Sequence, residues 1–420
     1  MKIAYFTDNY YPQLSGIATS VYQFARSLRK KGHTVYIFAP KIKGYTDREK
    51  NVYRLPSIRI FPHLPEGARL PLPIPNKNFR SMLKFNFDIV HGHGNGAFSL
   101  LGLAVARAKK VPYVFTFHTQ ISMFTHYFLK GTVVKPKHVN EIFLKRFGSI
   151  CDGIITPSEK MKDQLITNNV KKDIKVIPNF VDIDKFSQLE PKKGFLHKLC
   201  HIPASCPLLL AVGRVGKEKN FAFLIETFAK VTQVNKNAHL IIVGPDWGEM
   251  KRLKNQAAEL DVKHRVHLTG GIDIDQMPNV YADANIFVFP STSEVHPMVT
   301  IEAAVSGLPL IVAKDPAYKG IVINNKNGFV VPLDQDIFAR KIICLLDHPK
   351  LCQTMSKNST RLIKRNLNPG LLTNKLVNFY QDTLKNINPK RSANYSLLAQ
   401  SSQDRKAKRV KLFLQDSNVI

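Results

Sequence analysis

The sequence predicts an α/β protein with two Rossmann-like domains, each built on a doubly wound parallel sheet, facing each other across a cleft. Three observations lead to this fold class. Short apolar runs alternate with amphipathic helical stretches along most of the 420 residues. The alternation pauses near residue 185 and then restarts. Hydrophobic residues make up 44% of the chain and charged residues 22%, which is enough apolar side chain for sizeable cores.

The first predicted domain spans residues 1–185. Its apolar runs have the length of buried strands and lie at 2–7, 33–39, 87–93, 111–118 and 153–158. The first helix ends at basic residues and Gly32, and its apolar face consists of Ile17, Val21, Phe24, Ala25 and Leu28. Further helices are expected near 97–109, 137–148 and 158–169. Strands separated by helices indicate βαβ units and therefore a parallel sheet.

The second predicted domain spans residues 186–387 and begins with a polar, basic stretch. Its strands are expected at 208–213, 239–244, 266–270, 284–290, 308–313 and 328–332. A helix between the first two of these strands carries Phe221, Leu224, Ile225 and Phe228. Residues 388–420 are polar and include RKAKRVK, so they are predicted to form a disordered basic tail. The tail could attach to an anionic surface or a partner, or it could simply be solvated.

Several protein classes are disfavoured by composition. No run of eighteen or more apolar residues occurs, so a membrane-spanning helix is not expected. The first residues, MKIAYFTDNYYPQ, lack the long apolar segment and cleavage site of a secretory signal, so we expect a cytoplasmic protein. The five cysteines are odd in number and form no Cys-x-x-Cys pair. They therefore predict free thiols in a reducing compartment rather than a disulfide framework or a zinc module.

The formal net charge of +30 is concentrated in the first half of the chain. Residues 1–200 hold 32 Lys and Arg against 13 Asp and Glu, and residues 201–420 hold 29 against 18. Such an excess favours an anionic partner, which could be nucleic acid, an acidic membrane surface or a phosphorylated ligand. An excess that only aids solubility, or that follows a lysine-rich genome, is the alternative interpretation.

Ligands of doubly wound sheets bind beyond the carboxyl ends of the strands, so the strand–helix loops are the candidate binding segments. The loop PQLSGIATSV at 12–21 places Gly16 at a helix start, where backbone can approach a ligand and free N–H groups can attract an anion. It is not a G-x-G-x-x-G fingerprint. A glycine that serves the turn geometry alone is the simpler explanation of this loop.

Two loops of the second domain carry charged residues that suit a sugar diphosphate. In AVGRVGKEKN (211–220), Arg214 and Lys219 form a cation pair suited to a diphosphate, although two solvated surface cations would look the same. In the segment 287–312, Glu294 is expected in a loop and Glu302 about a turn into the following helix. Carboxylates accept hydrogen bonds from neighbouring sugar hydroxyls, and the helix N-terminus between them is a favourable position for a phosphate.

The Glu-x7-Glu spacing with VGRVGKEKN upstream resembles family 4 of the retaining glycosyltransferases, which have the GT-B fold. The resemblance covers about residues 1–385. Its other motifs are YFTDNYYPQLSGIATSV at the start, FTFHTQ at 115–120, IPNFVD at 177–182 and EAAVSGLP at 302–309. Four motifs in this order, within two Rossmann-like domains, are much more specific than the Glu-x7-Glu spacing alone.

The resemblance implies roles for individual residues of the second domain. Arg214 and Lys219 match the cations that neutralise the donor diphosphate as the nucleotide leaves. Glu302 matches the residue that holds the donor ribose, and Glu294 the one that contacts hydroxyls of the transferred sugar. We therefore expect Glu294, Arg214 and Lys219 to be catalytic as well as donor-binding.

The same resemblance assigns residues of the first domain and raises one question about the helix start. Gly16 matches the glycine whose backbone lies against the donor, and His118 matches a histidine beside the sugar, although His118 could also be a core-edge histidine. The family usually has a glycine near the middle of Glu-x7-Glu, whereas this chain has Pro297, which cannot donate an N–H to phosphate. The amides of Met298 and Val299 would have to replace it.

The family's chemistry is expected to need no metal and no cofactor, with the nucleotide sugar as co-substrate. No Asp-x-Asp metal motif stands out, and cations with helix termini can stabilise the leaving charge. A front-side retaining route is expected, in which the leaving phosphate helps to deprotonate the acceptor. A two-carboxylate mechanism would need a nucleophile beneath the sugar, and the sequence offers no clear one.

The acceptor is predicted to be a membrane lipid. The stretches 61–87 and 121–148 mix apolar and basic residues and suit an anionic membrane surface, although ordinary core packing is the alternative. The helical portion of the first stretch is expected to place Phe79, Met82, Leu83 and Phe87 beside Arg80 and Lys84. The start of the chain and the FTFHTQ…THYF region also resemble bacterial diacylglycerol glucosyltransferases. This resemblance implies UDP-glucose as donor, diacylglycerol as acceptor and a peripheral location on the inner face of the cell membrane.

Three other functions share parts of this pattern. A soluble glycosyltransferase acting on a polysaccharide, a small molecule or a protein would have the same donor motifs. A non-catalytic sugar-binding relative is disfavoured because Arg214, Lys219, Glu294 and Glu302 are all present. A nucleic-acid-binding protein would fit the charge, but no RNP motif, zinc finger or helix–turn–helix supports it, so no specific nucleic-acid partner is expected.

Overall fold

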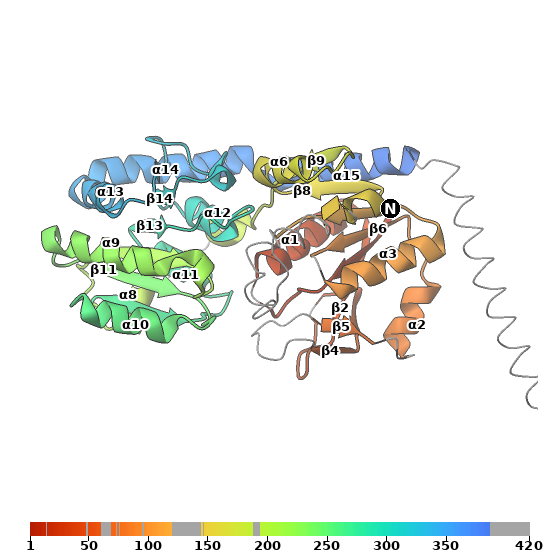
Figure 1. Ribbon diagram of the computed structural model, residues 1–420, viewed down its shortest axis with the longest axis horizontal. Coiled ribbons are helices and arrows are strands. Elements are labelled where there is room, and N and C mark those ends of the chain that lie inside the picture. The colour runs from red at the N-terminus through yellow and green to blue at the C-terminus, as the bar shows by residue number, and fades with distance from the viewer. Residues whose placement is uncertain are drawn as a thin grey trace, which may run out of the picture.

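The computed structural model contains two parallel β-sheets, which confirms the predicted fold class (Figure 1). It describes residues 1–13, 15–47, 49–59, 69–72, 74, 76–94, 96–119, 144–145, 147–187 and 194–386. The predicted tail at 388–420 and most of the stretch 121–148 lie outside these residues. No described helix combines the length and the apolar character that crossing a membrane requires.

The first sheet has seven strands in the order β3-β2-β1-β6-β7-β8-β9. Their bounds are β1 Lys2–Thr7, β2 Thr34–Pro40, β3 Val52–Leu55, β6 Ile89–His93, β7 Tyr113–Thr116, β8 Gly153–Thr156 and β9 Ile174–Val176. The helices of this part are α1 Gly16–Lys30, α2 Lys77–Lys84, α3 Ala97–Lys109, α6 Glu159–Thr167 and α7 Ile183–Ser187. A separate antiparallel pair is formed by β4 Ser57–Arg59 and β5 Arg69–Pro71. The sequence patterns did not predict the short strands β3, β4, β5 and β9.

The second sheet has six strands in the order β12-β11-β10-β13-β14-β15. Their bounds are β10 Leu208–Val212, β11 His239–Val243, β12 Val266–Gly270, β13 Ile286–Phe289, β14 Leu310–Ala313 and β15 Gly328–Val331. The helices are α8 Phe195–Leu199, α9 Phe221–Val234, α10 Met250–Glu259, α11 Met277–Ala282, α12 Met298–Val305, α13 Gln335–Asp347, α14 Pro349–Asn366 and α15 Pro369–Lys385. Short 3-10 turns are η2 Lys217–Lys219 and η3 Pro316–Tyr318. Each strand predicted for this sheet has its counterpart.

Burial along the strands explains why these runs are apolar throughout. All five residues of β10 and all four of β13 are buried, because helices cover both faces of a parallel sheet. The predicted face of α1 points into the first core, where Val21, Ala25 and Leu28 are fully buried. Ser15 caps this helix by accepting a hydrogen bond from the Ala18 amide at 3.1 Å. The Ser15 cap sets where α1 begins, and the apolar face sets which side of the helix meets the sheet.

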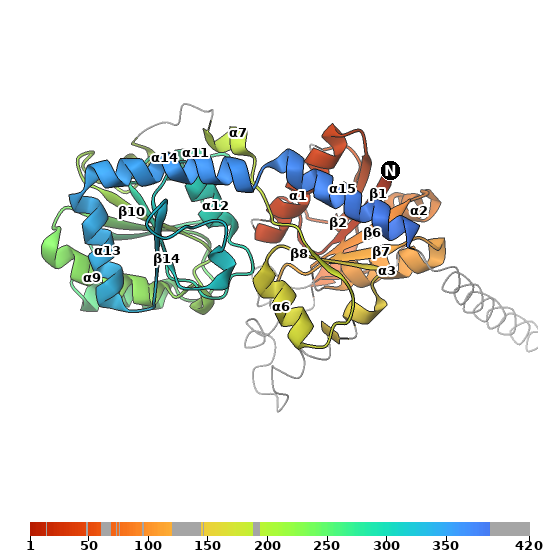
Figure 2. The same ribbon diagram turned by 90° about the horizontal axis from the view of Figure 1, so that it is seen from above.

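The last helix returns to the first domain. In Figure 2, α14 lies over the second sheet and α15 continues across the first. The Thr373 hydroxyl donates to Ser27 Oγ of α1 at 2.7 Å, and Tyr380 OH lies 2.6 Å from His91 Nδ1. A Cβ added at Gly153 of β8 would lie 2.9 Å from the Phe379 ring. The chain range predicted for the second domain, 186–387, therefore ends in a helix that packs on the first.

Candidate active site

The starts of α1 and α12 face each other between the two sheets. A Cβ added at Gly16 would lie 3.5 Å from Met298 Cγ. Gly16 is the first residue of α1, and Met298 is the first residue of α12, with Pro297 as its N-cap. The first amides of a helix have no acceptor within it, so two sets of N–H groups border the same space. This arrangement places Gly16 beside Met298, and the contacts of Gly16, Met298 and Val299 with a donor remain a prediction.

Lys219 and Glu294 form an ion pair in this region. Lys219 Nζ lies 2.6 Å from Glu294 Oε1, and the two side chains are only 13% and 12% exposed. Ser291 Oγ donates to the same carboxylate oxygen at 2.8 Å. Burial opposes ionisation of Glu294, but the Lys219 ammonium and these hydrogen bonds outweigh it and lower the pKa of the carboxyl. Glu294 is therefore held as a carboxylate beside a cation.

Arg214 is held in place by an aromatic ring. Its guanidinium carbon lies 4.2 Å from the centroid of Trp247, and Nη2 is 3.7 Å from Glu218 Oε1. The Arg214 loop is tied to the loop after β11, because the Val215 amide donates to the Pro245 carbonyl at 2.8 Å. Sequence reasoning missed Trp247. Its signal was the chain's single tryptophan, placed directly after a predicted strand.

Glu302 lies in α12, about a turn from the helix start, as the spacing predicted. Tyr281 of α11 donates a hydrogen bond to Glu302 Oε2 at 2.7 Å. Burial raises the pKa of Glu302 to about 7, more than the Tyr281 hydrogen bond and Lys185 lower it. The ionised form of this buried carboxyl would be stabilised by a ligand whose hydroxyl groups donate hydrogen bonds to it, as the two hydroxyls of a ribose can. Tyr281 was missed because nothing in its local sequence links it to Glu302.

His118 lies just beyond the carboxyl end of β7 and bonds within the first domain. Its Nε2 is 3.1 Å from Nδ1 of His93, and the two rings are stacked with centroids 5.4 Å apart. Burial lowers the pKa of His118 to about 3. The imidazole is therefore neutral near pH 7 and can act through hydrogen bonds but not as a cation. His93, which orients it, was missed, although the alternation His91-Gly-His93 at a strand end was a visible signal.

The structure brings two pairs of the predicted site residues into contact. Lys219 contacts Glu294, and Gly16 faces Met298. Glu302 and Arg214 are each held by an aromatic residue from a neighbouring loop or helix. The described residues contain no group of three or more His, Cys, Asp or Glu side chains placed to hold a metal ion.

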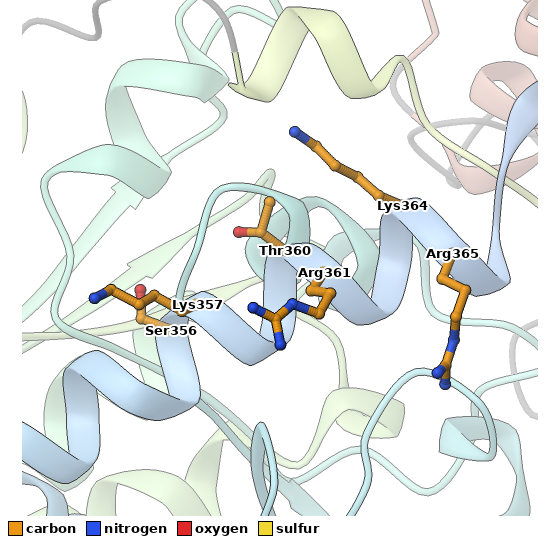
Figure 3. Close-up of a pocket in the computed structure, with 6 residues that line it drawn as sticks. All are labelled: Ser356, Lys357, Thr360, Arg361, Lys364 and Arg365. Atoms are coloured by element: carbon orange, nitrogen blue, oxygen red, sulfur yellow. The ribbon is translucent and has the colours of Figure 1, made fainter.

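A basic, open hollow with a volume of about 650 Å³ lies along α14 (Figure 3). None of the predicted site residues lines it. Its lining comes from this one helix and consists of Ser356, Lys357, Thr360, Arg361, Lys364 and Arg365. Ser356 Oγ donates to the Gly307 carbonyl, and Thr360 Oγ1 to the Val305 carbonyl at 3.5 Å. Both hydroxyls thus support the end of α12 opposite to the one that faces Gly16.

The apolar face predicted for residues 79–87 is wrong as a membrane surface. Met82 of α2 is fully buried, and Phe87, which follows this helix, is 5% exposed, because both pack in the first core. Leu83 alone of the predicted set is exposed, at 55%. Exposed apolar residues among the described part of this end include Ile58 of β4, Leu70 of β5 and Ile74. An amphipathic pattern cannot tell whether its apolar side meets a protein core or a lipid.

Comparison with known proteins covers both domains. The family described as Glycosyltransferase Family 4 matches residues 14–185, and Glycosyl transferases group 1 matches residues 200–362. The alpha-monoglucosyldiacylglycerol synthase of Streptococcus pneumoniae is 30% identical over 360 residues, which cover 84% of this chain and 80% of the relative. The enzyme of the same name from Acholeplasma laidlawii is 27% identical over 369 residues, covering 86% and 92%.

Solved structures share the fold at lower identity. The sucrose-phosphate synthase of Thermosynechococcus elongatus superposes with a TM-score of 0.72 at 20% identity, covering 91% of this chain and 98% of that one. Anabaena HepE in complex with UDP-glucose superposes with a TM-score of 0.70 at 17% identity, covering 91% and 100%. At these identities the likeness concerns the arrangement of the two domains and not the substrates.

Proposed function

The chain belongs to glycosyltransferase family 4 and has the GT-B fold, and from this premise we propose that it transfers glucose from UDP-glucose to 1,2-diacylglycerol at an anionic membrane surface. The proposal that the donor is a nucleotide sugar rests on the Lys219–Glu294 ion pair near the start of α12. The acceptor half is supported by the two monoglucosyldiacylglycerol synthases among the relatives.

The donor is proposed to lie between the starts of α1 and α12. Arg214 and Lys219 provide two positive charges, and the first amides of α12 add the positive end of a helix dipole. Glu302, held by Tyr281, is suited to the ribose hydroxyls. Glu294 is then free to hold the sugar once the diphosphate shares Lys219.

The proposed reaction retains the anomeric configuration. The bond between C1 of glucose and the phosphate oxygen breaks, and the acceptor oxygen forms a bond to C1 on the same face. The leaving phosphate takes the acceptor proton, while Arg214 and Lys219 stabilise its charge. Neutral His118 contributes a hydrogen bond to the sugar from the side of the first domain. We propose that these cations and the helix terminus do the work that a metal ion does elsewhere.

The membrane contact is proposed to lie at the β4–β5 end of the first domain. Ile58, Leu70 and Leu83 are between 43% and 55% exposed there. Exposed basic residues flank them, namely Arg59, Lys77, Arg80 and Lys84. Apolar side chains that insert among lipids, next to cations that meet anionic headgroups, are typical of peripheral attachment. Figure 1 places β4, β5 and α2 at one end of this domain. We therefore propose a peripheral protein on the inner face of the cell membrane.

Transfer of labelled glucose tests the proposal directly. Liposomes that contain diacylglycerol, with and without an anionic lipid, are incubated with radiolabelled UDP-glucose, and the organic-extractable label is counted. Label in the lipid phase, raised by anionic lipid and lost in Glu302→Ala, is the expected result. No lipid label with UDP-glucose, UDP-galactose or UDP-N-acetylglucosamine would overturn the lipid acceptor. The chain would then act on a soluble acceptor.

A further inference from the structure

Lys160 reaches from the first domain into the loop that carries Glu294. It lies in the first turn of α6, directly after the first sheet's strand β8. Its ammonium is 3.0 Å from the carbonyl oxygens of both Thr292 and Glu294. It is also 2.8 Å and 2.6 Å from the two carboxylate oxygens of Asp315, in the loop after β14. One side chain of the first domain thus joins two loops of the second.

The surroundings make these contacts strong. The Lys160 and Asp315 side chains are only 16% and 8% exposed, so water screens their attraction little. Three N–H groups of the ammonium are shared among four oxygens. Asp315 Oδ1 also accepts from the Ala317 amide at 2.8 Å and so begins the turn η3. Removing one partner of such a pair would leave a buried charge without compensation.

Val295 gives a second, apolar attachment of the same loop. This side chain is 6% exposed and packs in the apolar cluster of the first domain, which includes Phe117 beside His118. The neighbouring Glu294 carboxylate is held from the other side, by Lys219 and Ser291 of the second domain. Tyr318 fixes Ser291 by donating to its carbonyl at 2.7 Å. Glu294 is therefore held by the second domain through its side chain and by the first domain through its backbone.

We propose that Lys160 is a positioning residue that sets the Glu294 carboxylate for the transferred sugar when the two domains close. The assignment rests on the proposed role of Glu294 in transfer. Lys160 acts through the loop, since among the described residues its ammonium contacts two backbone carbonyls and Asp315. Of the residues proposed to hold the nucleotide, Arg214 and Glu302 are anchored within the second domain by Trp247 and Tyr281, and Lys219 comes from the turn η2 of the same domain. Loss of Lys160 should therefore leave nucleotide affinity intact and slow transfer.

The test compares Lys160→Met with Lys162→Met. Lys162 carries the same charge two residues along α6, where residues do not share a face. We expect Lys160→Met to lower kcat at least about tenfold, as mispositioned groups do. UDP affinity by calorimetry should stay within about twofold, because its anchors are untouched. Lys162→Met should match the wild type in both. A loss of kcat and UDP affinity together, or no loss of either, would overturn the positioning role.

Two further measurements separate this proposal from loss of folding and from a wrong acceptor. Asp315→Asn keeps the cap of η3 but removes the charge. When Asp315→Asn is combined with Lys160→Met, the double variant should regain the thermal stability that Lys160→Met loses, but its kcat should stay low. Small-angle scattering with UDP reads domain closure without any acceptor, and Lys160→Met should increase the radius of gyration relative to the wild type. An unchanged radius would contradict the closure role, whereas a wild type that labels no lipid would contradict only the acceptor.

Discussion

The two domains present their functional surfaces in different ways. The second domain concentrates its chemistry in the loops after β10 and β13, where Arg214, Lys219 and Glu294 stand within a few ångströms of charged or aromatic partners. The first domain offers a neutral histidine pair, an exposed apolar edge and most of the excess positive charge. A donor of fixed chemistry needs fixed side chains, whereas a lipid surface needs only apolar area and charge. Under the proposed function, this difference explains why the charged residues of the donor site gather in the second domain.

The largest effect expected from this comparison falls on the second domain. Lys219→Met removes a cation proposed to act on the diphosphate and leaves the buried Glu294 carboxylate without its partner. Initial rates of glucose transfer should fall by about 100-fold or more, the size typical of a lost transition-state charge contact. Binding to anionic vesicles should not change. A fall of less than tenfold would show that Lys219 is not the main charge stabiliser.

A smaller effect is expected from the first domain's exposed edge. Leu70→Glu places a charge opposite Ile58, its partner across β4 and β5, and should weaken sedimentation with anionic vesicles about tenfold, the equivalent of one lost apolar anchor. Val234 of the second domain is 63% exposed, and Val234→Glu makes the same chemical change there. Equal binding by the two variants would place the membrane contact elsewhere.

The smallest effect concerns one buried carboxyl in each domain. Burial raises the pKa of Asp8 and that of Glu302 to about 7, from ordinary values of 3.8 and 4.5. The folded chain therefore binds more protons than the unfolded chain between those values and about 7, and it loses stability as pH rises through that window. Asp8→Asn and Glu302→Gln should each flatten the decline of Tm between pH 5 and 7.5 by a few degrees.

Nucleotide binding distinguishes these two carboxyls. Asp8 accepts from the Phe98 amide at 3.2 Å at the start of α3, so Asp8→Asn should bind UDP normally. Glu302→Gln should bind UDP more weakly, and the pH dependence of binding near 7 should be reduced. Calorimetry of both variants across this pH range is the measurement. Equal UDP affinity in the two variants would remove Glu302 from the ribose site.

The sequence was sufficient for most strands of the two sheets and for the position of Glu302 in α12. Apolar runs of strand length gave β10 to β15, and the spacing of Glu294 and Glu302 gave the start of α12. The short strands β3 and β9 were missed because three or four residues carry little pattern. For Met82 and Phe87 a membrane surface was preferred over core packing, although both residues are buried in the first core.

The residues that hold the site in place could not be predicted. Trp247, Tyr281 and Lys160 belong to elements far along the chain from the residues they contact. Their partners depend on how helices and loops approach in three dimensions, and no spacing in one sequence encodes that approach. Motifs therefore identified the charged residues proposed to meet the substrate, and the structure was needed to identify what orients them.

The return of α15 to the first domain has a consequence for synthesis on the ribosome. Residues 1–185 leave the ribosome early. The hydrogen-bond partners of Tyr5, Ser27 and His91 in α15 are synthesised much later, since they are Thr373 for Ser27 and Tyr380 for the other two. The nascent first sheet must therefore remain partly uncovered until almost the whole chain has been made, while the second sheet can fold on its own residues in the meantime. The domain translated first is thus the one completed last.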